Sequence, residues 1–98
     1  MTETGETFTT LLTRPGVRVE RIESHGHVTP PCETYDQAGD EWVFIAAGAA
    51  RLWLEGRGEV SLSTGDHLLI PAHCRHRVTW TDPERTTVWI ALFLEVAD

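Results

Sequence analysis

The sequence contains no lysine, and its eight strongly basic residues are all arginine. Without a lysine amine, Schiff-base catalysis and a lysine general base are excluded. The formal net charge is -7 at pH 7, whereas a nucleic-acid-binding protein needs a basic face. We therefore expect no nucleic-acid partner.

Long apolar segments are also missing. No run approaches the roughly 18 apolar residues that a membrane span needs, and the first ten residues lack the basic and apolar regions of a secretory signal. The two cysteines, Cys32 and Cys74, form no Cys-x-x-Cys pair and are too few for a disulfide framework. These absences predict a cytoplasmic protein with two reduced thiols and no membrane partner.

A Ser-His-Asp order, a phosphate-binding loop and a dinucleotide fingerprint are absent, and no segment has a helical period. The sequence does contain short β-rich segments between turn residues, about 8 to 12 residues apart, which is typical of an all-β sandwich or barrel. We predict strands at residues 17–22, 32–37, 41–47, 50–54, 59–62, 67–70, 76–80 and 86–94. Residues 1–14 are expected to form an N-terminal tail or edge strand, and 15–98 a single barrel domain.

Two of these strands, 41–47 and 76–80, begin with an ionisable residue, Glu41 and His76 respectively. Alternation places each of them on one face with apolar side chains. These are Val43, Ile45 and Ala47 in the first strand and Val78 and Trp80 in the second. A carboxylate on an apolar face is costly unless it is paired or bound to a cation. The two strands therefore predict a site at a barrel mouth, with a pocket lined by Val43, Val78 and Trp80.

Residues 41–48 and 65–76 resemble the two sequence motifs of the cupin superfamily. The first motif has two histidines one residue apart, a glutamate three or four residues on, and a glycine seven residues later; Glu41 and Gly48 keep the last spacing. The second motif is matched by Gly65, Pro71 and His76, with His73 in the place of a glycine. The resemblance covers roughly residues 15–95. It implies a jelly-roll β-barrel, often dimeric, in which motif residues hold any metal ion.

Both histidines of the first motif are missing from this chain. Their places are taken by Tyr35 and Gln37 if three residues separate the second histidine from Glu41, or by Thr34 and Asp36 if four residues separate them. The resemblance thus leaves Glu41 and His76 as metal ligands, with Gln37 or Asp36 as oxygen donors. One imidazole with oxygen ligands holds Zn²⁺, Fe²⁺, Mn²⁺ or Ni²⁺ less tightly than three imidazoles do.

Other histidines could complete such a site. His25 and His27 form a His-x-His pair before the first motif, and they join His76 only if their loop folds over the mouth; otherwise they are surface imidazoles. His73 lies at a turn near the rim and either touches a bound metal or ligand or faces solvent. His67 should face outward, because its neighbour Leu68 faces inward.

Structural roles remain open for the two central residues. Glu41 could pair with an arginine such as Arg51 across a hairpin, and His76 could be a core histidine that donates to a backbone carbonyl. Cys74 is off the face of His76, which argues against a thiolate nucleophile. If Tyr35 points inward, it could serve as a proton donor.

Two function classes follow. The first is a small cupin enzyme, an isomerase, lyase or dioxygenase, that binds a divalent metal at Glu41 and His76 and acts on a small oxygenated substrate. In it, Tyr35 and Glu41 would be catalytic. The second is a non-catalytic module that binds a small ligand with weak or no metal, which the missing histidine pair favours. A ligand-free structural dimer is a third reading, against which the inward Glu41 counts. A homodimer is expected in each case.

Overall fold

The computed structural model describes residues 5–30 and 32–95, and this part of the chain is built from strands without a helix. The strands are β1 (Gly5–Arg14), β2 (Val17–His25), β3 (Glu41–Ala47), β4 (Ala49–Leu54), β5 (Gly58–Ser63), β6 (His67–Ile70), β7 (His76–Thr81) and β8 (Thr87–Leu94). The all-β prediction is confirmed. Across the described ranges, accordingly, no helix is long and apolar enough to span a membrane.

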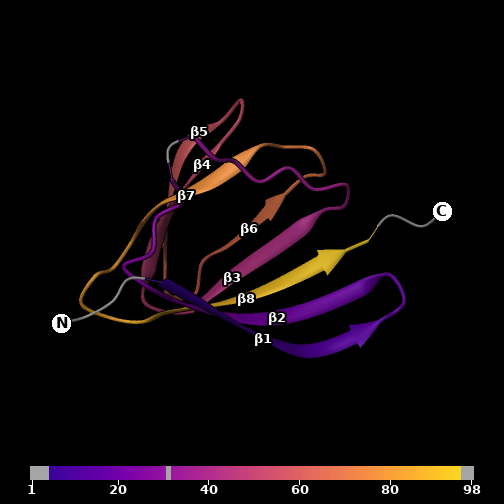
Figure 1. The fold of residues 1–98 in the computed structure, drawn as a ribbon, viewed down its shortest axis with the longest axis horizontal. Coiled ribbons are helices and arrows are strands. Elements are labelled where there is room, and N and C mark those ends of the chain that lie inside the picture. The colour runs from indigo at the N-terminus through magenta and orange to yellow at the C-terminus, as the bar shows by residue number, and fades with distance from the viewer. Residues whose placement is uncertain (1–4, 31, 96–98) are drawn as a thin grey trace.

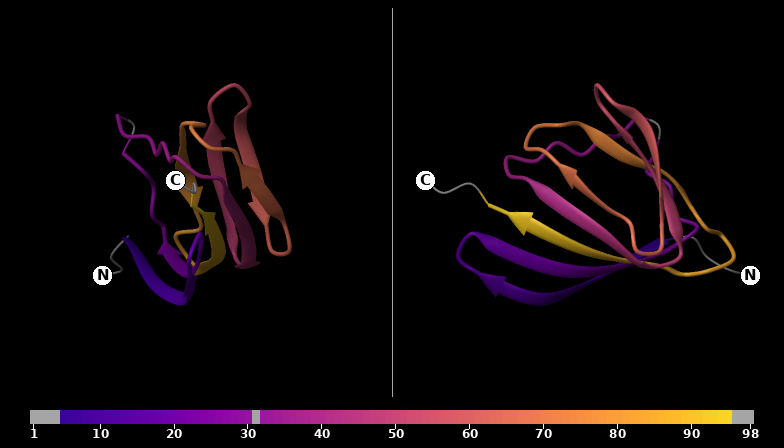
Figure 2. Two further views of the ribbon diagram at one scale, coloured as in Figure 1. Left: turned by 90° about the vertical axis from the view of Figure 1, so that its right-hand side faces the viewer. Right: turned by 180° about the vertical axis from the view of Figure 1, so that it is seen from behind.

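The strands form two antiparallel sheets, as a cupin jelly roll requires. One sheet has the order β1-β2-β8-β3-β6 and the other the order β5-β4-β7 (Figure 1). Figure 2 shows the two sheets meeting near the turn from β3 to β4 and diverging from there. β3 therefore begins at the open side, and Glu41 is its first residue.

The core lies between the two sheets and follows the alternation expected of strands. Along β3, Glu41, Val43 and Ile45 are buried while Trp42 and Phe44 are only half-buried. His67 is exposed at the start of β6, as expected. The buried apolar residues are Ile22, Val43, Ile45, Ala50, Leu52, Leu54, Leu62, Leu68, Ile70, Val78, Trp89 and Ala91.

Two strand predictions are wrong: residues 32–37 do not form a strand, and Ala47 does not share the buried face of β3. At residues 32–37 the structure has only an isolated bridge between Tyr35 and His76. Ala47 is exposed instead of sharing the buried face of Ile45, because the register of β3 against β8 shifts between these two residues. Strict alternation fails where a bulge inserts an extra residue.

A second register shift moves Trp80 away from its expected position. Val78 pairs with Leu52 and Trp80 with Arg51, so Thr79 is the extra residue of a bulge in β7. The Trp80 ring lies on the other face, with the Arg51 guanidinium 5.4 Å from its centroid. Thr81 is buried in its place, so Trp80 does not line the pocket as the alternation predicted.

β1 is an edge strand at residues 5–14, and it is part of the larger sheet; residues 1–4 of the expected tail lie outside the described residues. It pairs with β2, so that Glu6 lies opposite Ser24 and Phe8 lies opposite Ile22. Because Ile22 and Ser24 are buried, this register directs Glu6 and Phe8 toward the space between the sheets.

Candidate functional site

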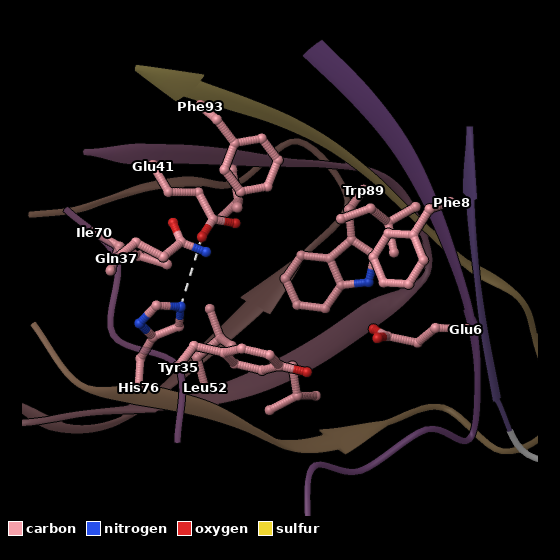
Figure 3. Close-up of a pocket in the computed structure, with 13 residues that line it drawn as sticks. Glu6, Phe8, Tyr35, Gln37, Glu41, Leu52, Ile70, His76, Trp89 and Phe93 are labelled. Carbon is pink, nitrogen blue, oxygen red and sulfur yellow. Dashed lines mark ion pairs between the residues drawn. The ribbon is translucent and has the colours of Figure 1, made fainter. Parts of the chain in front are cut away.

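A cavity of about 100 Å³ opens between the two sheets. Its wall is mostly apolar, and its polar members are two carboxylates, one imidazole, one phenol and one amide (Figure 3). The lining residues are Glu6, Phe8, Ile22, Tyr35, Gln37, Glu41, Val43, Leu52, Ile70, His76, Val78, Trp89 and Phe93. An apolar pocket with a few convergent polar groups is the usual form of a small-molecule site.

The pair formed by Glu41 and His76 is the most buried polar feature of this pocket. Each residue is the first of its strand, β3 or β7, and they are 8% and 5% exposed. The Oε1 atom of Glu41 lies 3.6 Å from Nε2 of His76. Tyr35 fixes the start of β7, because its N–H donates to the His76 carbonyl at 2.7 Å and its carbonyl accepts the His76 N–H at 3.1 Å.

The surroundings of His76 determine where its protons lie. Its Nδ1 is 2.9 Å from the Cys74 carbonyl oxygen, which can only accept, so Nδ1 carries a proton and Nε2 faces Glu41. Burial by itself would lower the pKa of His76. The contact with Glu41, the Cys74 carbonyl and the negative charges of Glu41 and Asp36 outweigh burial and raise that pKa above its ordinary value of 6.5. The contact with Glu41 therefore favours the protonated, cationic form of His76.

Glu41 does not pair with Arg51, and His76 bonds a backbone carbonyl through one ring nitrogen. Arg51 lies over Trp80 and on another strand face, so it is not the partner of Glu41. The core-histidine reading is correct for Nδ1 only, since Nε2 points into the pocket toward the carboxylate (Figure 3).

The raised pKa of His76 predicts a stability that depends on pH. Because the pKa is higher in the folded protein than the roughly 6.5 of the unfolded chain, the stabilisation is complete below about pH 6.5 and is lost as pH rises through the folded-state pKa. Urea denaturation across this window should show a falling free energy of unfolding. The fall should disappear in His76→Gln and persist in His67→Gln, which removes an exposed imidazole. An unchanged pH dependence in His76→Gln would contradict the assignment.

The structure brings together some of the predicted site residues and separates others. Tyr35, Gln37 and Glu41 line the pocket with His76, and so do Val43 and Val78. Tyr35 packs against His76 with ring centroids 5.6 Å apart. Figure 3 shows its hydroxyl directed away from His76, and it shows Gln37 beside Glu41.

The other three candidate histidines do not line this pocket. His25 ends β2 and pairs with Gly5. His27 lies beside Glu6, with 3.3 Å between Nε2 and Oε1. The His73 side chain is 72% exposed at the rim, where its Nδ1 is 3.2 Å from Asp36 Oδ1. Its φ of 61° explains why the second cupin motif has glycine at this position.

The metal implied by the resemblance finds few donors here. Within residues 5–30 and 32–95, no three His, Cys, Asp or Glu side chains converge on one point. Glu41 and His76 supply one carboxylate and one imidazole, and the amide of Gln37 is a weak addition. Zinc sites use three or four protein ligands, so this donor set does not fit a tightly held metal ion.

Several lining residues were not foreseen from the sequence, above all Glu6 and Phe8 of β1. The threonine-rich start of the chain predicts a tail or an edge strand and supplied no candidate site residue. Alternation of Glu6 and Phe8 with threonines was the available signal, but it indicates an inward face only once the pairing with β2 is known.

Comparisons with known proteins agree with this architecture. A crystal structure from Ralstonia eutropha, of a protein provisionally named a mannose-6-phosphate isomerase, is 44% identical, with a TM-score of 0.90 over 94% of this chain and 86% of that one. A cupin superfamily protein from Desulfitobacterium hafniense is 18% identical, with a TM-score of 0.79 over 98% of this chain and 83% of that one.

An enzyme of similarly low identity shares the fold alone. The DMSP lyase DddQ from Ruegeria pomeroyi is 20% identical, with a TM-score of 0.77, and the match covers 95% of this chain but 48% of the lyase. No curated protein matches this sequence. The family described as the cupin domain matches residues 18–93, which is most of the chain. This protein therefore belongs to the cupin family.

Proposed function

We propose that this cupin binds a small oxygenated molecule between its sheets and moves a proton on it, as an isomerase does. The observation that carries the proposal is the buried Glu41–His76 pair, 3.6 Å apart in a mostly apolar pocket. Buried acid–base pairs in clefts are typical of proton-transfer sites. The relative provisionally named an isomerase supports the same reaction class at 44% identity.

The geometry gives each group a role. With a hydroxy-carbonyl compound in the pocket, Glu41 accepts a proton from the carbon next to the carbonyl, and Nε2 of His76 donates a proton to the carbonyl oxygen. These two transfers give an enediol intermediate. Glu41 then returns its proton to the former carbonyl carbon, and His76 takes the proton of the neighbouring hydroxyl, which becomes the new carbonyl. Nδ1 stays bound to the Cys74 carbonyl throughout, so the ring keeps its orientation. The apolar wall excludes water from the intermediate.

A second candidate is ligand binding without catalysis, which the tyrosine and glutamine at the motif's histidine positions favour. A divalent metal, if present, would be held by Glu41, His76 and Gln37 and would polarise the carbonyl. Because these donors fit a metal ion poorly, we assign the metal no step in the reaction.

The homodimer, the cytoplasmic location and the catalytic role of Tyr35 stay predictions.

Deuterium uptake tests the proposal directly. Untagged protein is incubated in D₂O with glyceraldehyde or dihydroxyacetone, and exchange at the carbon next to the carbonyl is followed by ¹H NMR. We expect exchange by the wild type, a loss of about 100-fold or more in Glu41→Gln and in His76→Gln, and no effect of a chelator. Glu84→Gln, an exposed carboxylate away from the pocket, is the matched control.

The other outcomes separate the alternatives. Binding without exchange would favour the non-catalytic module. Exchange that disappears with a chelator, together with near-stoichiometric metal by elemental analysis that His76→Ala loses, would show a metal-dependent enzyme instead. If the protein showed no binding and no exchange, the proposal would be overturned.

A further inference from the structure

A second carboxylate lies in the same pocket, on the opposite side from Glu41 (Figure 3). The Glu6 side chain is 13% exposed, and a chain of hydrogen bonds holds it in place. The Trp89 indole Nε1–H donates to Ser24 Oγ at 3.0 Å, and the Ser24 hydroxyl donates to Glu6 Oε2 at 3.1 Å. Ser24 is fully buried and Trp89 is 3% exposed, so this carboxylate is rigidly oriented.

The other oxygen of Glu6 is not matched by a comparable donor. Oε1 lies 3.3 Å from Nε2 of His27, yet the two do not form a hydrogen bond, and among the described residues Nε2 is buried without a partner. A carboxylate accepts up to about four hydrogen bonds. Among the described residues, Glu6 accepts one hydrogen bond, from Ser24. Its carboxylate is mostly buried and can accept further bonds, which a donor group of a ligand in the pocket would supply.

The charges along the wall restrict the ligand further. Glu6 and Glu41 line the pocket, and none of its lining residues is an arginine. Arg18 lies over the Phe93 ring at 4.4 Å and is 3.2 Å from Glu20. It lines an adjoining cavity, which shares Gln37 and Phe93 with the pocket, but it does not line the pocket itself. A phosphate dianion in the pocket would face two carboxylates, and the described residues that line it offer one imidazole as a cationic partner.

We propose that Glu6 is a specificity-determining residue, which binds a hydroxyl or ammonium group of the ligand and excludes phosphorylated compounds. The inference rests on the proposed function, since it concerns the same pocket. The preferred ligand is uncharged or cationic, and it has one hydrogen-bond donor for Glu6 and another for Glu41 on the opposite side of the pocket. This chain would therefore differ in substrate from an enzyme that takes a sugar phosphate.

Three probes with one carbon skeleton test this proposal: glycerol, 3-amino-1,2-propanediol and glycerol 3-phosphate. Each is titrated into ¹⁵N-labelled protein, and the Trp89 indole N–H signal, assigned with Trp89→Phe, reports the Glu6 side of the pocket. We expect the amine to bind most tightly and the phosphate most weakly. Glu6→Gln should reduce the preference for amine over glycerol by about tenfold, the effect of losing one charged hydrogen bond. Glu84→Gln should leave the preference unchanged.

Each remaining outcome is decisive. A preference for glycerol 3-phosphate, or an unchanged ratio in Glu6→Gln, would overturn the role of Glu6. If Glu41→Gln still abolished deuterium exchange in that case, the proposed function would stand without it. If none of the three probes shifted the Trp89 or His76 signals, and no exchange occurred, both proposals would fail together.

Discussion

Replacing Gly48 with alanine is expected to lower the free energy of unfolding by about 3 kcal/mol. Gly48 connects β3 to β4 with a φ of 87°, a conformation that is unfavourable for a residue with a Cβ atom. A Cβ at this position would also lie 2.8 Å from Thr87 Cα and 2.7 Å from Thr87 Oγ1. Thr87 is fully buried and donates to the Ala49 carbonyl at 2.9 Å, so it cannot move aside without breaking this bond.

Gly56 provides the matched control for this prediction. Its φ is 81°, but a Cβ there would have no neighbour within 4 Å. Gly56→Ala should therefore cost only the backbone term, about 1 kcal/mol. Urea denaturation of both variants measures the difference. Equal losses would show that the approach of Thr87 does not matter at Gly48.

His76→Leu is expected to destabilise the protein by about 3 kcal/mol, since it leaves the Glu41 carboxylate buried without its partner. The two side chains are 6% and 10% exposed, so little solvent screens their interaction. Replacing both residues with leucine should restore the free energy of unfolding to within about 1 kcal/mol of the wild type, because paired apolar side chains substitute well for a buried ion pair. Denaturation of both single variants and the double variant forms the cycle.

The cycle also separates stability from function. Glu41→Leu/His76→Leu should fold but show no deuterium exchange, because both proton-transfer groups are gone. If the loss of stability in the double variant equalled the sum of the losses in Glu41→Leu and His76→Leu, the two residues would not interact in the folded protein. In that case the raised pKa of His76 would need another explanation.

Most strands could be located from the sequence because their residues obey local rules. β6 alternates between inward and outward side chains along its length, and β3 does so from Glu41 to Ile45. Turn residues such as Gly65 separate the strands. The rules failed at residues 79 and 46, where bulges shift the register. A bulge depends on how the neighbouring strand pairs, which a single strand's pattern does not record.

The site was predictable only in part. Glu41 and His76 were found because each opens a strand with an apolar face, and the structure places them 3.6 Å apart. His25, His27 and His73 were candidates on residue type and spacing, and none of them lines the pocket. Residue type and spacing identify groups that can bind a metal, but they do not show which way a loop carries them.

The sequence by itself determined the all-β class, the cupin motifs and the two central ionisable residues, because strand periodicity, turn chemistry and charge are local properties. The tertiary structure alone decided that β1 reaches the pocket and that Glu6 forms its second acidic wall. It also decided that Trp80 lies outside. Those outcomes depend on pairing between strands that are distant in the chain, such as β2 with β8, and on the register of that pairing. One inserted residue shifts the register and turns the side chains that follow to the opposite face of the sheet.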